Sequence, residues 1–413
     1  MSNKLTGACV FAQSGGPTTV INASAYGVIK TALESPDITN VYAAEHGIVG
    51  ILNETLFDLS KEDPSELELL LNTPSSEFGS CRYKMSDPAV DDKDYKRILE
   101  VFKKFNIRYF FYNGGNDSMD TCKKVSDFMA QSGWDCRVIG VPKTIDNDLV
   151  GTDHCPGFGS AAKYVATSIA EVYKDATVYD IGAITIVEVM GRHAGWLTGA
   201  AALAKLTGAS PDLIYLPEVA FNMDSFLSDI EAVYKAKNKC LVVVSEGISY
   251  ADGTFVAEST SKDGFGHAQL GGLAYSLSDV VKKHTGAKVR GIELSLLQRC
   301  AAHIASQTDI NESFLAGKTA VERAVAGETG KMVAFACERD ASGNYSCDVS
   351  LQDLSICANS EKKVPREWIN ENGTFVTQEF IDYVLPLIQG ESSRKLEHGL
   401  PRFAQLKKIV AKV

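Results

Sequence analysis

The sequence predicts an α/β fold in which mostly parallel strands are covered by helices. Short apolar runs typical of buried strands occur at 7–12, 107–112, 136–141, 181–189, 212–216, 239–245 and 331–337. Patterns with helical periodicity lie between them, at 94–105, 159–174 and 223–235. Strands that alternate with helices along a chain are typical of a largely parallel sheet.

Length and composition limit the classes of protein to consider. The chain has 413 residues, 45% of them hydrophobic and 23% charged, which is enough for a large buried core. Its net charge of −11 argues against a nucleic-acid-binding surface. No apolar run approaches the roughly 20 residues that span a membrane, and residues 1–6 lack the apolar core of a signal peptide. We therefore expect a cytoplasmic protein without membrane contact. Its ten cysteines lack zinc-site spacing and are expected to be reduced.

Two of the apolar runs continue into glycine-containing turns. The first leads into Gln13-Ser14-Gly15-Gly16-Pro17, with a helix expected to begin near Thr18. The second leads into Asn113-Gly114-Gly115-Asn116-Asp117-Ser118, ahead of an amphipathic helix. Paired glycines at such a turn let backbone N–H groups approach a phosphate, and the helix N-terminus adds a favourable field. Because tight turns also need glycine for geometry alone, one such turn is only a weak indication.

A third turn follows the run at 136–141 and carries more chemistry. Within Lys143-Thr144-Ile145-Asp146-Asn147-Asp148 there are a cation, a hydroxyl and two carboxylates. Residues of an extended stretch alternate in direction, so Asp146 and Asp148 can face one pocket. One could accept a proton while the other helps hold a metal. The alternative is a solvated loop with local turn hydrogen bonds. Three such turns after three apolar strands favour a phosphoryl-transfer site.

These motifs, in this order, resemble the phosphofructokinase family and specifically its pyrophosphate-dependent members. The resemblance spans roughly residues 5–305 and is carried by Gly15-Gly16, Gly114–Ser118, Pro142–Asp148, Glu188–Trp196 and Gln298-Arg299. It implies a two-lobed fold of mostly parallel sheets covered by helices. Residues 1–155 with about 303–385 are expected to form the phosphoryl-donor lobe, and 156–302 the sugar-phosphate lobe. Residues 386–413 are expected to be a C-terminal tail, in which 406–413 has the pattern of a short basic helix.

The resemblance implies reversible, magnesium-dependent phosphoryl transfer from pyrophosphate to the C1 hydroxyl of fructose 6-phosphate, a step of glycolysis. Asp146 is the expected general base, and Thr144 is expected to hydrogen-bond the transferred group or the sugar. Asp148 is expected to orient Asp146 or to bind magnesium through water. Asn116 stands where the family has a carboxylate, so with Asp148 it is expected to hold the metal through water rather than directly.

The resemblance also implies that the donor is pyrophosphate rather than ATP. Lys143 and Asp117 occupy positions that are typically glycine in ATP-using members. The ammonium of Lys143 would offset charge on the transferring group, and Asp117 would repel an α-phosphate. The rest of the donor site is expected from Gly15, Gly16, Arg82, Gly115, Asn116 and Ser118.

The sugar phosphate is expected to bind Met190, Gly191, Arg192, Glu246, Arg290 and Arg299, together with Thr144 and Asp146. Arginines would grip the 6-phosphate bidentately, and Glu246 would accept from sugar hydroxyls unless it serves as a cap or ion-pair partner. Ala183 replaces an arginine that reaches a neighbouring subunit in many relatives, and Leu296 replaces a histidine or tyrosine. A homo-oligomer, dimer or tetramer, is expected, although the family's contacts between subunits do not carry over directly.

Two other functions remain as alternatives. One is an ATP-dependent 6-phosphofructokinase, which Lys143 and Asp117 argue against. The other is a regulatory subunit without turnover, which the retention of Asp146 and Asp148 argues against. Gly317-Lys318-Thr319 resembles the end of a P-loop, but no leading glycine or strand precedes it.

Overall fold

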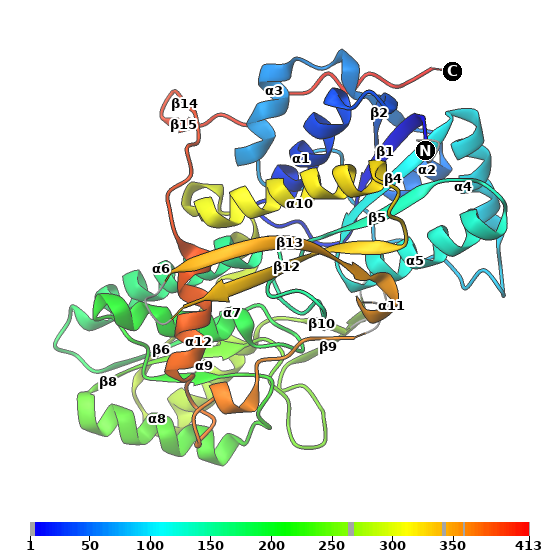
Figure 1. Ribbon diagram of the computed structural model, residues 1–413. Helices are drawn as coiled ribbons and strands as arrows, with labels where there is room; N and C mark the ends of the chain where they lie inside the picture. The colour runs from blue at the N-terminus through cyan, green and yellow to red at the C-terminus, as the bar shows by residue number, and fades with distance from the viewer. Residues whose placement is uncertain (1–4, 263–267, 341–343, 358–359, 413) are drawn as a thin grey trace.

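The computed structural model describes residues 5–262, 268–340, 344–357 and 360–412. Within these residues the chain forms two main sheets, of seven and four strands, with helices on their faces (Figure 1). The predicted α/β fold with mainly parallel sheets is therefore confirmed. Among the described helices, none combines the length and the apolar character that crossing a bilayer requires.

The larger sheet lies in the upper half of Figure 1. Its strands are, in spatial order, β13 (Tyr345–Asp353), β12 (Lys331–Arg339), β5 (Arg137–Pro142), β4 (Ile107–Gly114), β1 (Gly7–Gln13), β2 (Ile38–Ala44) and β3 (Leu56–Asp58). The strands from β12 to β2 run parallel, and the two outermost strands are antiparallel to their neighbours. Because β1 is buried along its whole length, it shows the continuous apolar run typical of a central parallel strand.

Helices cover both faces of this sheet. Alternate residues of β1 show the division: Cys9 and Phe11 pack in the same core as α1 (Ile21–Glu34) and α10 (Gln307–Val325). Val10 packs on the other face, with α4 (Lys93–Lys104) and α5 (Asn116–Gln131). The shorter helices of this half are α2 (Ile48–Leu52), α3 (Pro64–Glu68) and α11 (Leu354–Cys357).

The smaller sheet is parallel throughout. Its strands are, in spatial order, β11 (Lys288–Glu293), β6 (Ala183–Val189), β8 (Lys239–Ser245) and β7 (Leu213–Tyr215). One face packs with α6 (Phe158–Thr177), α7 (Trp196–Ala200) and α12 (Gln378–Val384). The other packs with α8 (Met223–Lys237) and α9 (Leu273–Thr285). Two small hairpins complete the described strands: β9 (Glu258–Lys262) with β10 (Ala268–Leu270), and β14 (Leu396–Glu397) with β15 (Leu400–Pro401).

The end of the chain connects the two halves. The stretch that contains Val364 and Phe380 packs with α6 and the smaller sheet. The chain then returns to the larger sheet, where both termini lie (Figure 1). There the predicted basic helix at 406–413 is wrong, since up to residue 412 the segment has no helix. It runs along β3 instead, and Asp58 N–H donates to the carbonyl of Ile409 at 2.8 Å. The unpaired edge of β3 supplies backbone partners that a surface helix would leave unused. The division into donor lobe, sugar-phosphate lobe and tail stays a prediction.

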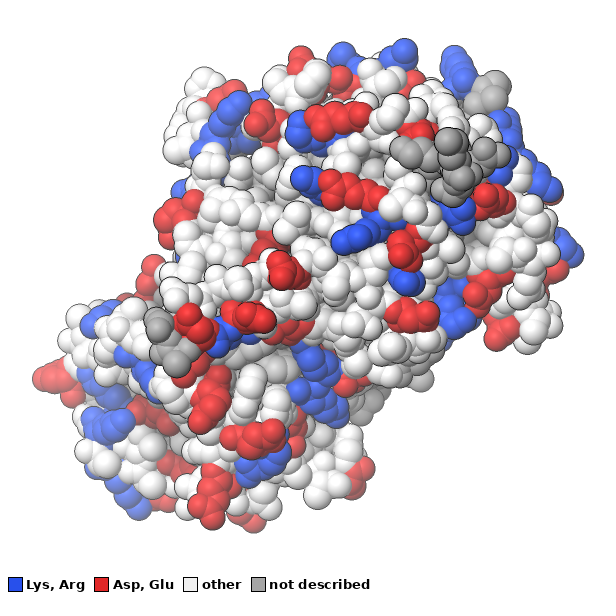
Figure 2. All heavy atoms as spheres, viewed as in Figure 1, with Lys and Arg blue, Asp and Glu red and all other residues white. Residues whose placement is uncertain are grey.

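Acidic and basic side chains are interspersed on the face drawn in Figure 2. On that face the described residues form no continuous basic stripe.

Candidate active site

The three polar turns meet because three strands end in register. Gln13 of β1 pairs with Asn113 of β4, which pairs with Val141 of β5. In the smaller sheet, Val189 of β6 pairs with Ser245 of β8, so the residues after these strands also emerge side by side. Ligands of open α/β sheets bind at such carboxyl edges. Here the carboxyl edges of both sheets open into the same cavity.

The cavity has a volume of about 610 Å³ and is lined by residues of both sheets. It gathers most of the predicted site residues: Gly15, Gly16, Arg82, Gly115, Asn116, Asp117, Ser118, Lys143, Thr144, Asp146, Asp148, Met190, Arg192, Glu246 and Arg299. Predicted donor and acceptor residues thus face one cavity.

Two cations lie against the glycines of the first turn. Gly15 has φ +75°, and a Cβ there would come within 3.0 Å of the Lys143 ammonium. A Cβ on Gly16 would come within 3.2 Å of the Arg299 guanidinium. A side chain at either position would crowd the cation beside it. The bare backbone leaves room for an anion beside them.

The second turn places a helix N-terminus at the cavity. Gly115 immediately precedes α5, and Asn116, Asp117 and Ser118 form its first turn. Gly114 has no room for a side chain, since a Cβ there would lie 2.0 Å from the Ser118 hydroxyl. The N–H groups at the start of this helix have no intrahelical partner and attract phosphate oxygens.

The third turn is held in shape by its own hydrogen bonds. Asp146 N–H donates to the Thr144 hydroxyl at 3.1 Å, and Thr144 N–H donates to the Pro156 carbonyl at 3.1 Å. Asn147 adopts φ +54° and is completely buried. Its side chain donates to Tyr383 and accepts from Cys155 N–H, both at 2.9 Å. With Asn147 anchored in the core, the carboxylates on either side of it line the cavity.

The alternation in side-chain direction that was predicted for this stretch does not hold throughout the turn. Lys143 and Ile145 line the cavity as well as Thr144, Asp146 and Asp148. The left-handed backbone at residue 147 breaks the extended geometry on which alternation depends. The turn therefore presents its cation and both carboxylates to the same space.

The opposite wall comes from the smaller sheet. Met190 N–H donates to the side-chain carbonyl of Gln298 at 3.2 Å, which ties the turn after β6 to the segment that carries Arg299. Gly191 does not line the cavity, but its N–H donates to Glu246 at 3.3 Å and so supports that carboxylate from behind.

Besides Gly191, three more of the positions singled out in the sequence lie outside the cavity. Arg290 is exposed on β11 and forms an ion pair with Asp175 at 3.2 Å. Ala183 begins β6, and Leu296 is 54% exposed in the short 3-10 turn Ser295–Arg299. None of the three lines the cavity.

Two residues of the C-terminal region line the cavity although no motif indicated them. Ser360 and Glu361 reach it from the chain that follows α11. Glu361 lies 2.9 Å from Nδ1 of His193, which also lines the cavity. His193 belongs to a motif that the sequence had singled out. Nothing in the local sequence around residue 360 indicates a site, and only the fold brings it there.

The cavity carries a cluster of cations. Lys143 is 4% exposed, and this burial lowers its pKa to about 8 in spite of the neighbouring carboxylates. Burial also lowers the pKa of Arg299, and the charge of Arg82 adds to that effect. A bound polyanion would relieve this repulsion, because it supplies the opposite charge.

The two carboxylates have raised pKa values. Burial raises the pKa of Asp146, and the charge of Glu246 raises it further. Burial likewise raises the pKa of Asp148, with Asp146 as the next cause. Carboxyls with such raised pKa values are better bases than an ordinary aspartate, and groups of this kind cluster at active sites.

Asn116 and Asp148 offer oxygen atoms of the kind that magnesium prefers. The amide of Asn116 donates to Asp148 at 3.1 Å. Its own Oδ1 is buried and accepts no hydrogen bond from the described residues. An unused buried acceptor beside a carboxylate fits a hydrated cation, which would supply the missing donor.

The chain is similar to known proteins along most of its length. The family model described as Phosphofructokinase matches residues 8–324. A pyrophosphate--fructose 6-phosphate 1-phosphotransferase of Halomonas elongata is 45% identical over 402 residues, 96% of each chain. The corresponding protein of Methylococcus capsulatus is 44% identical over 96% of this chain and 95% of its own. A crystal structure of a pyrophosphate-dependent phosphofructokinase from Marinobacter aquaeolei superposes with a TM-score of 0.89, at 42% identity and 98% coverage of both chains.

Proposed function

The chain belongs to the phosphofructokinase family, and we propose that it transfers a phosphoryl group from pyrophosphate to the C1 hydroxyl of fructose 6-phosphate. The products are fructose 1,6-bisphosphate and phosphate, and the reaction is reversible. One observation carries this conclusion: a single cavity brings buried Lys143 and the N-terminus of α5 together with Asp146 and Asp148. Relatives that resemble the chain along nearly its whole length are named for the same reaction.

The donor lies between the glycine turns and the cations. Gly15 and Gly115 leave backbone open to phosphate oxygens, and the α5 N-terminus supplies N–H donors. Lys143 and Arg82 face the same space. Fixed positive charge of this kind stabilises the charge that spreads over the equatorial oxygens during transfer.

Proton transfer is the role of Asp146. As the C1 oxygen attacks the terminal phosphorus, its proton passes to the Asp146 carboxylate, while the phosphoanhydride bond breaks and phosphate leaves. The hydrogen bond from Asp146 N–H to Thr144 fixes the backbone that carries this base. Positioned proton transfer of this kind contributes roughly 10² to 10⁴ in rate.

The sugar phosphate occupies the wall formed by the smaller sheet. Glu246, held by Gly191 N–H, accepts from sugar hydroxyls, and Arg192 and Arg299 bind the 6-phosphate. In its own chain Arg290 does not line this cavity, and it forms an ion pair with Asp175 instead. We therefore propose a homo-oligomer in which Arg290 serves the cavity of a neighbouring copy.

Magnesium is the implied cofactor. Asn116 and Asp148 would hold it, through water at Asn116 because an amide brings no charge. When bound, the ion supplies positive charge to the pyrophosphate oxygens. The residues of this chain then position the donor and accept the proton.

Specificity for pyrophosphate rests on two side chains. Asp117 stands in the first turn of α5 and lines the donor end of the cavity, where its charge would repel the α-phosphate of ATP. Lys143 offsets the charge of a small donor that brings no nucleoside contacts.

The direct test is product formation by the purified chain. With fructose 6-phosphate, pyrophosphate and magnesium, fructose 1,6-bisphosphate and phosphate should appear in equal amounts. With fructose 1,6-bisphosphate and phosphate, the reverse reaction should form pyrophosphate. Phosphate release without sugar bisphosphate would instead indicate a pyrophosphatase.

A further inference from the structure

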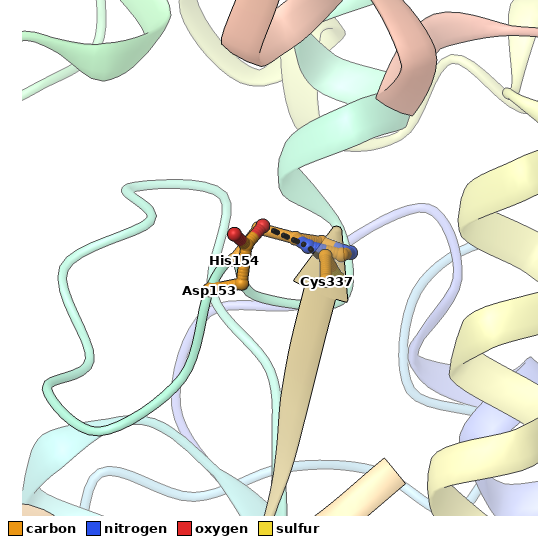
Figure 3. Close-up of side chains that lie close together, drawn as sticks. All are labelled: Asp153, His154 and Cys337. Atoms are coloured by element: carbon orange, nitrogen blue, oxygen red, sulfur yellow. Dashed lines mark hydrogen bonds and ion pairs between the residues drawn. The ribbon is translucent and has the colours of Figure 1, made fainter. Parts of the chain in front are cut away.

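A cluster of titratable side chains outside the cavity joins the loop before α6 to β12 (Figure 3). His154 is 1% exposed. Its Nδ1 lies 3.0 Å from Asp153, and its Nε2 lies 2.7 Å from Glu312. The sulfur of Cys337 lies 3.7 Å from the same Nδ1. The phosphoryl-transfer reaction uses none of these residues.

The imidazole of His154 is a buried cation. Both of its nitrogens face carboxylate oxygens, which only the protonated ring can satisfy with two N–H donors. Burial alone would lower the pKa of His154. Hydrogen bonds with Asp153, Cys337 and Glu312 outweigh that effect and raise it well above its ordinary value. A fixed positive charge therefore lies beside the Cys337 sulfur.

A second cysteine faces Cys337 across the hairpin. In the antiparallel pair of β12 and β13, Cys337 lies directly opposite Cys347. Residues in such positions have Cα atoms about 4.5–5.5 Å apart, within the range of about 4.4–6.8 Å that a disulfide spans. Both thiols are free and only partly buried. The pairing therefore places the two cysteines at a Cα separation that a disulfide can span.

The pKa values of the two thiols shift in opposite directions. A hydrogen bond from the Cys347 thiol lowers the pKa of Cys337 to about 6, with help from His154 and against the effect of burial. The pKa of Cys347 is raised, first by that same hydrogen bond and then by burial. Tyr345 completes the surroundings, with its hydroxyl 3.4 Å from the Cys337 sulfur and donating to Glu312 at 2.7 Å.

We propose that Cys337 and Cys347 form an oxidation site that reacts with hydroperoxides and closes to a disulfide. The Cys337 thiolate attacks one peroxide oxygen, so that an S–O bond forms and the O–O bond breaks. The leaving oxygen takes a proton from solvent, as water when the oxidant is hydrogen peroxide. Cys347 then attacks the oxidised sulfur, and its proton leaves with the hydroxyl group as a second water. Two thiols are oxidised and one peroxide is reduced.

A metal site is the competing assignment. The ligand atoms of Asp153, His154 and Cys337 lie within 4.8 Å of one another. However, Arg339 already holds Asp153 through two hydrogen bonds of 2.9 Å. A metal would have to displace that guanidinium and a proton from His154. The charges present favour a thiolate beside an imidazolium.

The first experiment compares alkylation rates in the full chain. Iodoacetamide at neutral pH, followed by peptide mass spectrometry, gives a rate for each cysteine. Cys300 is the internal control, because it is the exposed cysteine of this chain. We expect Cys337 to react at least tenfold faster than Cys300, and its rate to reach a plateau below pH 8. A faster Cys300, or a Cys337 rate that rises through pH 8.5, would overturn the proposal.

The second experiment identifies the product. Hydrogen peroxide should remove two thiols and give a peptide that joins Cys337 to Cys347, reversed by dithiothreitol. In Cys347→Ser the oxidised Cys337 should persist and be trapped by dimedone, whereas Cys300→Ser should behave as wild type. Oxidation confined to other cysteines, or no trapping in Cys347→Ser, would contradict the proposal. Zinc in the purified protein that protects Cys337 until a chelator removes it would establish the metal site instead.

Discussion

Asp146 and Asp148 are identical side chains with different neighbours. Both line the cavity and both have raised pKa values because of burial. Asp148 is bonded by the Asn116 amide, and its backbone carbonyl accepts from Lys362 N–H at 2.7 Å. Asp146 has Thr144 beside it, and the carboxylate of Glu246 raises its pKa. Asp148 is thus tied into the wall, and Asp146 is the better candidate for proton transfer.

Replacing Asp146 by asparagine should separate the base from binding. The amide keeps the size of the side chain but cannot accept the proton, so kcat should fall by roughly 10² to 10⁴ while KM for fructose 6-phosphate changes much less. Steady-state kinetics of Asp146→Asn at saturating pyrophosphate measure both constants. If kcat is unchanged, Asp146 is not the base, and a change confined to KM makes it a binding residue.

The charge of Glu246 should be visible in the pH dependence. A general base must be deprotonated to act, so kcat/KM falls as pH decreases through the raised pKa of Asp146. Removing the charge in Glu246→Gln should lower that pKa and move the acid limb to lower pH. Ionisation of the substrates is the same for both proteins, so the difference reports the enzyme. An acid limb that stays in place or moves to higher pH would refute the assignment.

The sequence alone indicates those site residues that lie together in one short polar motif. Lys143, Asp146 and Asp148 follow one strand, and all three line the cavity. Ser360 and Glu361 lie far along the chain from the polar motifs, beyond β12, β13 and α11. Only the fold brings them to the cavity, so the local sequence could not indicate them. Arg290 shows the opposite case, since the family resemblance indicated a residue that lies outside the cavity of its own chain.

At the scale of elements, the apolar runs predicted β1, β4 to β8 and β12, and missed several other strands. β13 (YSCDVSLQD) has only partly buried and exposed side chains, because it is an outermost antiparallel strand. β11, outermost in the smaller sheet, likewise has no fully buried residue. Such strands lack a continuous apolar run, and their pairing partners decide their conformation. The extended tail along β3 was missed for the same reason.

Gly317 belongs to a helix contact rather than to a phosphate loop. It lies inside α10, where a Cβ would come within 2.0 Å of the Ser24 carbonyl of α1. Alanine in a helix interior is usually favoured over glycine by roughly 0.5–1 kcal/mol, but overpacking here costs about 1–3 kcal/mol. Gly317→Ala should therefore lower Tm. Lys318→Ala, on the same helix with a partly exposed side chain, is the matched control and should change Tm little. A rise in Tm for Gly317→Ala would show that the two helices are not in close contact.

At the scale of the whole molecule, two arginines should behave differently. Arg299 lines the cavity of its own chain, so Arg299→Ala should raise KM for fructose 6-phosphate with a smaller change in kcat. Arg290→Ala should do the same only if a neighbouring copy supplies that residue. At low fructose 6-phosphate, where both variants are slow, mixing Arg290→Ala and Asp146→Asn proteins under subunit exchange should then restore some activity. No recovery of activity would mean that each site is built within one chain. A change in KM for pyrophosphate alone would mean that these arginines bind the donor instead.

Three observations together determine the expected choice of donor: the cavity, the side chains of Asp117 and Lys143, and the family to which the chain belongs. The most direct measurement is kcat/KM for pyrophosphate and for ATP in parallel, from fructose 1,6-bisphosphate formation at saturating fructose 6-phosphate and magnesium. We predict turnover with pyrophosphate and little with ATP, and loss of pyrophosphate use when both residues are replaced by glycine. Comparable kcat/KM values for the two donors in the wild-type protein would contradict the account.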